Sequence, residues 1–168
     1  ANVYPVAGDH DFTALKMLTG FEKMLKSGAT PDPEFAADMM AWAADGGKVT
    51  LDGYRALDEE MREGILDYLS EFSLFEEATI NGKDYVLVHA GIGGFDPALS
   101  PDEYEPEDFF VPAKPGERFY PGKTLIVGGA PTGGKIEREE GLIRINCGLR
   151  ETGVLGCLCL ETGEEIYV

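Results

Sequence analysis

The spacing of hydrophobic residues predicts a helical first part of the chain and a strand-rich second part. Across residues 12–27, apolar side chains recur every three or four positions, which places them on one face of a helix. A second helix is predicted to begin at Asp32-Pro33 and a third to follow Asp58, because these residues favour helix starts. Gly28 and the pair at 46–47 are the predicted stops.

The second part alternates short apolar runs with turn residues. Asn81-Gly82 predicts a tight hairpin, and residues 92–122, rich in Gly, Pro and acid, predict a long loop with one short helix near 102–110. This order predicts an α/β layer protein, folded as a single domain over residues 1–168, with an antiparallel C-terminal sheet. The predicted strands are 3–7, 75–80, the run ending at His89, 124–127, 142–146, 154–160 and 165–168.

The candidate chemistry lies where two of these strands end. Tyr85–Val88 has the composition of a strand buried on both faces, and it stops at His89 followed by Ala and Gly. Ligand sites of α/β sheets lie at the carboxyl ends of strands, although a histidine can also simply cap a strand. The strand predicted at 3–7 is followed by a predicted turn at residues 8–11, which begins with Gly8 and contains Asp9, His10 and Asp11. Asp11 is the predicted N-cap of the helix over 12–27.

Asp9, His10 and His89 could therefore meet at one edge of a sheet. Carboxylate and imidazole ligands suit Mn, Fe or Zn, and such clusters are typical of metal-assisted phosphate chemistry. The chain has only two histidines, so one imidazole would serve as a ligand and the other as an acid. Two protein ligands bind a divalent ion poorly.

The composition narrows the classes of function. A formal charge of −17 disfavours binding to nucleic acid, although a bound metal can still attract an anionic substrate. The sequence contains neither an apolar run long enough to span a membrane nor a recognisable signal peptide. The cysteines at 147, 157 and 159 do not suggest disulfides or a zinc site, and they predict a reducing, cytoplasmic location.

Six ordered segments resemble the calcineurin-like metallophosphoesterases, and specifically the bacterial relatives of the Ser/Thr protein phosphatases. The first ends in Gly-Asp-His-Asp at 8–11, where the family has Gly-Asn-His-Asp or Gly-Asn-His-Glu. The second comprises Trp42 with Gly-Gly at 46–47 and Thr50. The others are Tyr85–Gly91 with its His-Ala-Gly, Thr124–Thr132 in place of Gly-His-Thr-Pro-Thr, and the C-terminal strands at 145–148 and 155–164.

The resemblance implies a function and a set of site residues. It implies a metal-dependent phosphoesterase, with Mn as the first choice and Fe or Zn as alternatives, acting on a phosphorylated protein or a small phosphomonoester. Asp9 and His89 would be metal ligands. His10 would act on the leaving group and Asp11 would orient it. The implied fold is a layered α/β/β/α sandwich.

The departures from the family pattern are as specific as the matches. Asp9 stands where the family has Asn, and Gly129 stands where it has a histidine ligand. The Asp-x-His and Gly-Asp-x-x-Asp-Arg motifs are absent, which implies an N-terminally incomplete fold. The segment 109–116 lacks the expected Trp and Arg, for which Arg118 could substitute.

These departures leave three alternatives open. The chain is a weak or inactive phosphoesterase, a catalytically silent binding or regulatory module, or a truncated fragment. A fold without its first strands would leave a sheet edge unpaired, so we also expect self-association or a partner that supplies strands.

Overall fold

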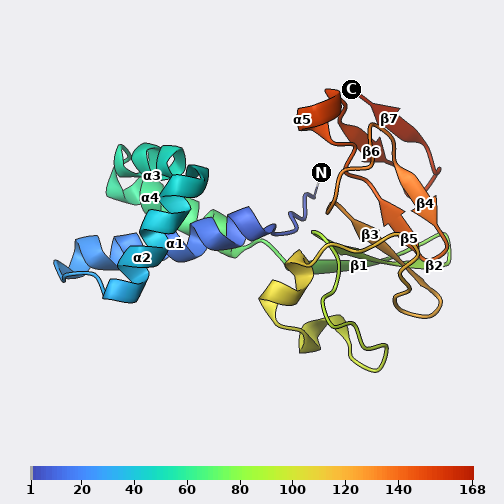
Figure 1. Cartoon of the computed structure of the whole chain (residues 1–168), viewed down its shortest axis with the longest axis horizontal. Coiled ribbons are helices and arrows are strands. Elements are labelled where there is room, and N and C mark those ends of the chain that lie inside the picture. The colour runs from blue at the N-terminus through green and yellow to red at the C-terminus, as the bar shows by residue number, and fades with distance from the viewer. Residues whose placement is uncertain (1) are drawn as a thin grey trace. The chain divides into compact units, whose positions relative to one another are not determined.

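The computed structural model describes residues 2–168, which fold into two compact units (Figure 1). The helical unit is Asp9–Phe72. The sheet unit combines the residues up to Gly8 with Ser73–Val168. The expected α/β class is confirmed, because the chain combines helices with a mixed sheet and a small antiparallel sheet. That residues 1–168 act as a single domain stays a prediction.

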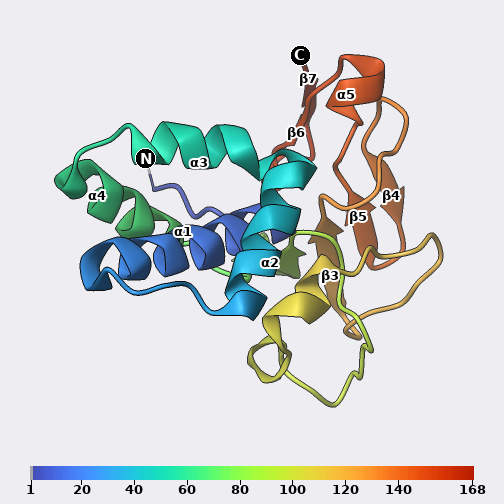
Figure 2. The same ribbon diagram turned by 60° about the vertical axis from the view of Figure 1, so that its left-hand side comes forward.

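The helical unit follows the predicted hydrophobic spacing, with one addition. Helices α1 (Asp9–Ser27), α2 (Pro33–Trp42) and α4 (Glu59–Ser70) confirm the three predicted helices (Figure 2). The predicted break at the glycine pair 46–47 is confirmed, because Gly46 has a positive φ of 103°. The backbone leaves helical angles only at Asp45 and Gly46 and then continues as α3 (Lys48–Arg55).

Local hydrogen bonds fix the ends of these helices. Asp32 accepts a bond from the backbone N–H of Phe35 (3.3 Å), and Asp58 accepts one from that of Met61 (2.9 Å). Gly28 ends α1 with a positive φ of 64°. Within residues 2–168, no helix combines the length and the apolar content needed to cross a bilayer.

The turn predicted at residues 8–11 is wrong, because α1 already begins at Asp9. Asp9, His10 and Asp11 therefore form the first helical turn instead of a loop, and Asp11 is not the N-cap. Two carboxylates in a first turn interact favourably with the helix dipole, which explains the earlier start.

The main sheet of the sheet unit has the order β1-β2-β3-β5-β4. Strands β2 (Lys83–Val88), β3 (Lys123–Val127) and β5 (Leu142–Arg144) run parallel, whereas β1 (Phe75–Ile80) and β4 (Glu137–Glu139) are antiparallel to their neighbours. The short helix α5 (Leu149–Thr152) follows β5. A small sheet pairs β6 (Gly156–Leu158) with β7 (Glu165–Tyr167) in the antiparallel sense, as predicted for the C-terminus.

The predicted hairpin is confirmed, whereas the predicted first strand is wrong. Asn81 and Gly82 both adopt positive φ (53° and 73°), as the tightest hairpin turns require. Residues 3–7 make only an isolated parallel bridge from Val6 to Ser73, in part because Pro5 has no N–H to donate. Strand β4 was not predicted, because Glu-Arg-Glu contains no apolar side chain.

Two apolar layers cover the two faces of the main sheet. Val86, Val88, Leu125, Val127 and Leu142 belong to one layer, with at most 4% of each residue exposed. Tyr85, Ile126 and Ile143 belong to the other. Burial of Tyr85–Val88 on both faces is therefore confirmed. The long loop covers the first layer with aromatic residues, and its predicted short helix consists of two 3-10 turns, Pro101–Glu103 and Pro106–Phe110.

Candidate functional site

The parallel strands place three motif-bearing segments at one edge of the main sheet. Strand β2 is followed by His89, β3 by Gly128, and β5 by Ile145. Because these three strands are parallel neighbours, their following residues emerge at the same edge. We call this the carboxyl edge. It is the position at which open α/β sheets bind ligands.

The His89 imidazole lies against the backbone of Gly8. A Cβ atom at position 8 would lie 2.8 Å from Cε1 and 2.9 Å from Nδ1 of the ring, so only glycine leaves room for it. The ring of Phe110 meets the imidazole edge to face, at 6.3 Å between centroids. Gly8, which the sequence analysis treated as a turn residue, therefore positions the histidine.

The main chain around His89 is held by loops on two sides. The His89 carbonyl accepts hydrogen bonds from the N–H groups of Gly128 (2.7 Å) and Gly129 (2.8 Å). The next residue, Ala90, donates to the Phe109 carbonyl (3.1 Å) and accepts from the N–H of Ala113 (2.9 Å). The N–H groups of Gly128 and Gly129 are thus engaged by protein and are not presented to a ligand.

Gly129 is closely packed against the strand end. A Cβ atom there would lie 2.9 Å from the Ala90 carbonyl oxygen and 3.3 Å from the Ala90 Cα, both of which are backbone atoms. The Asn146 side chain holds the same loop, because its Nδ2 donates to the Gly129 carbonyl at 2.7 Å. Position 129 therefore has no room for the histidine of the family pattern without a shift of the main chain.

Asn146 is a site residue that the sequence analysis did not single out. Besides its bond to Gly129, its Oδ1 accepts from the N–H of Gly148 (2.9 Å), and its carbonyl accepts from the N–H of Thr132 (2.8 Å). The signal in the sequence was a polar side chain close to the end of an apolar run, at the second position after β5.

The predicted site residues belong to two different units. His89 lies in the sheet unit, where Gly8, Gly128 and Gly129 contact it. Asp9, His10 and Asp11 lie in the first turn of α1, in the helical unit, where Asp9 and His10 are exposed and Asp11 is half-buried.

The donor set does not fit a binuclear metal centre. Within the described residues, no group of three or more His, Cys, Asp or Glu side chains is gathered so that it could hold a metal ion. Asp9 and His89 would supply two ligands, whereas catalytic zinc sites use three from the protein and structural ones four. The close packing of Gly129 removes the position at which a further imidazole would enter.

A perturbed titratable cluster lies elsewhere, inside the helical unit. Glu22, only 5% exposed, accepts hydrogen bonds from Arg62 Nε (3.0 Å) and from the Tyr54 hydroxyl (3.3 Å). Burial, together with the charge of Glu22, raises the pKa of Tyr54 to about 12. Perturbed groups often mark active sites, but this cluster joins α1, α3 and α4 and has the form of a structural ion pair.

A scan of the chain against known protein families finds no match, and a search of curated proteins finds no significantly similar sequence. The class of protein is defined by the fold and the site: it is a mixed α/β chain with a candidate site around His89 at the carboxyl edge of the main sheet.

Proposed function

We propose that the chain forms a phosphatase-like domain of the metallophosphoesterase type. The proposal is supported by the order of the resembling segments and by the position of three of them. Those that contain His89, Gly129 and Asn146 emerge at one carboxyl edge and are hydrogen-bonded to one another. We extend the proposal to the layered α/β/β/α sandwich, of which this chain would hold an N-terminally incomplete part.

We further propose that residues 1–168 alone act as a silent, non-hydrolytic form of this domain. The observation that carries this proposal is the close packing of Gly129 against the Ala90 backbone. A second metal would need an imidazole there, and the main chain occupies the space. Because Asp9 and His89 do not make a fitting donor set, we assign no hydrolytic step to them.

The second candidate is a phosphoesterase that acts on a phosphorylated protein or a small phosphomonoester, with Mn (or Fe or Zn) as its metal. It is favoured by His89, the ligand position that matches the family unchanged, and by its location at the carboxyl edge. In this form, ligands beyond those of residues 1–168 would complete the metal site. His10, oriented by Asp11, would then protonate the leaving oxygen.

The regulatory role would require a partner, and the outer edge of β1 is the candidate surface. In the described part of the chain, β1 pairs with β2 on one side and carries no strand on the other. Such an edge invites pairing with a further strand, from a second copy or from another protein. A concentration-independent monomer in light scattering would contradict this part of the proposal. A cytoplasmic location is supported by the free thiols of Cys147, Cys157 and Cys159.

The test of the silent form is a calorimetric titration with Mn²⁺, followed by an assay with an aryl phosphate. We expect no saturable binding at millimolar Mn²⁺ and no turnover above that of metal alone. The variants His89→Ala and His10→Ala remove one imidazole each, from the sheet unit and the helical unit respectively. The silent form would be rejected in favour of the enzyme by two results together. Mn²⁺ would bind saturably and lose this binding in His89→Ala, and turnover would occur and be lost in His10→Ala.

A further inference from the structure

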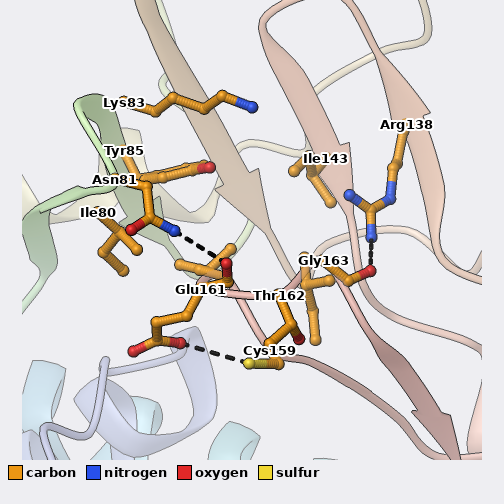
Figure 3. Close-up of a pocket in the computed structure, with 12 residues that line it drawn as sticks. Ile80, Asn81, Lys83, Tyr85, Arg138, Ile143, Cys159, Glu161, Thr162 and Gly163 are labelled. Carbon is orange, nitrogen blue, oxygen red and sulfur yellow. Dashed lines mark hydrogen bonds between the residues drawn. The ribbon is translucent and has the colours of Figure 1, made fainter.

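A second candidate site lies in the sheet unit, near the amino end of β2 and away from the carboxyl edge. Here a cavity of about 160 Å³ opens between two hairpin turns (Figure 3). One is the Asn81-Gly82 turn between β1 and β2, and the other is the turn at 161–163 between β6 and β7. None of the residues of the proposed phosphatase-like site lines this cavity.

The two turns are fixed to each other and to the main sheet. Asn81 Nδ2 donates to the Glu161 carbonyl at 2.9 Å, and Arg138 Nη2 donates to the Gly163 carbonyl at 3.0 Å. Arg138 Nε also pairs with Glu165 at 2.8 Å. The walls are therefore held by specific side-chain bonds to three backbone or carboxylate oxygens, and the cavity is a constructed feature of the fold.

Apolar and polar side chains both line the cavity, and Lys83 and Arg138 lie among them. Tyr85 and Ile143, which are 8% and 7% exposed, come from the second apolar layer of the main sheet. Lys83 lies on the rim, and within residues 2–168 its ammonium group takes part in no hydrogen bond or ion pair. The carboxylate of Glu161 points to the opposite side from Lys83 and Arg138, where it accepts a bond from the Cys159 thiol at 3.4 Å.

We propose that this cavity binds a small anion built on a single planar ring, of the chemical class of benzoate. The size supports the ring: an engineered apolar cavity of about 150 Å³ is large enough to bind benzene. The ring would pack on Tyr85 and Ile143, and the carboxylate would face Lys83. Because Arg138 is already paired with Glu165, the ammonium group of Lys83 is the cation that would attract the carboxylate.

The test is a titration of the full chain with benzoate, followed in amide NMR spectra. We expect saturable shifts confined to the two turns and to the start of β2, with affinity in the millimolar range that a ligand of this size can reach. Benzamide keeps the ring and lacks the charge, so it should bind about two- to fivefold more weakly, as the loss of an exposed ion pair predicts.

Two matched variants separate the anion site from unspecific binding. Lys83→Gln should weaken benzoate about two- to fivefold and leave benzamide unchanged. Lys135→Gln removes an exposed lysine of the same unit that does not line the cavity, and it should change neither affinity. Leu158→Phe fills the cavity from its wall and should abolish both, with the rest of the amide spectrum confirming that the variant is folded.

Three results would overturn the proposal: no saturation at tens of millimolar benzoate, shifts that map outside the two turns, or equal effects of Lys83→Gln and Lys135→Gln. Because the cavity is independent of the carboxyl edge, none of them bears on the proposed phosphatase-like function.

Discussion

The two units of this chain bury very different material. In the sheet unit, the central strands contribute fully buried aliphatic side chains, with Val86 and Leu142 at 0% exposure and Leu125 at 1%. In the helical unit, α1 contributes Met17 and Leu18, but its third buried residue is the carboxylate of Glu22. Among the described residues, α2 and α4 have none that is fully buried.

The structures of the two units are therefore determined in two different ways. Apolar burial in the sheet unit supplies stability at about 25 cal/mol per Å², without regard to direction. A buried ion pair contributes little net stability, but it penalises every arrangement that leaves its charges unpaired. We therefore expect truncation of apolar side chains to be most costly in the sheet unit, and loss of a polar partner to be most costly in the helical unit.

The largest effect is expected from Leu142→Ala in the core of the main sheet. The residue is fully buried in the first apolar layer, so its truncation leaves a cavity and should lower the free energy of unfolding by about 2–5 kcal/mol. Hydrogen exchange of the β2, β3 and β5 amides in urea measures this loss. Leu149→Ala is the control, because Leu149 is 54% exposed and its truncation should cost less than about 0.5 kcal/mol. Equal losses in the two variants would contradict the assignment of the core.

The next effect is expected from Arg62→Met in the helical unit. The substitution leaves the Glu22 carboxylate buried with only the Tyr54 hydroxyl as partner, and it should cost about 1.5–3 kcal/mol. Trp42, the single tryptophan, lies in α2 and reports unfolding of this unit by fluorescence. Replacing both charges, in Glu22→Met with Arg62→Met, should recover part of the loss. If the double variant is less stable than Arg62→Met, the stability lost in Arg62→Met does not come from leaving the Glu22 carboxylate without its ion-pair partner.

Most of the local structure of the chain could be predicted from the sequence, because local signals determine it. Asp32-Pro33, Asp58 and Asn81-Gly82 each act within a few residues, and each was confirmed. The two errors in strand prediction occurred where distant residues decide. Residues 3–7 look like a strand, but a strand needs a partner of matching length, and only Ser73 pairs with them. Conversely, β4 lacks apolar residues, yet it forms because it pairs with β5 along its length.

The candidate site could be predicted only in part, for the same reason. The strand-end rule located His89, but the positions that shape its surroundings are glycines. Nothing in the sequence indicates that Gly8 makes room for the imidazole or that Gly129 touches Ala90, because both contacts join segments far apart in the chain. The extent of α1 was a purely local error, since the acidic residues at 9 and 11 favour a helix start as well as a turn.

A smaller effect tests whether glycines also determine the packing of the helical unit. In Gly20→Ala, the new Cβ would overlap the ring of Phe35, so close contact between α1 and α2 depends on this glycine. We expect a loss of about 1–2 kcal/mol, since overpacking outweighs the gain in helix propensity. Gly64 is also interior to a helix and has open space around it, so Gly64→Ala should instead stabilise by about 0.5–1 kcal/mol. Urea titrations followed by Trp42 fluorescence compare the two, and a gain in both variants would show that Phe35 moves aside freely.

The smallest effect concerns pH and is confined to the helical unit. The pKa of Tyr54 is raised to about 12, first by burial and then by Glu22, so the folded state favours the protonated phenol. This stabilisation is fully present below the pKa of the unfolded state, near 10, and it is lost as the pH rises through 12. The loss amounts to roughly 1 kcal/mol at pH 11. The urea midpoint of Trp42 fluorescence should therefore fall more steeply between pH 9 and 11 in the wild type than in Tyr54→Phe, which has no phenol to ionise. Parallel falls in the two proteins would mean that the Tyr54 hydroxyl is accessible to solvent and that the polar cluster around Glu22 is open.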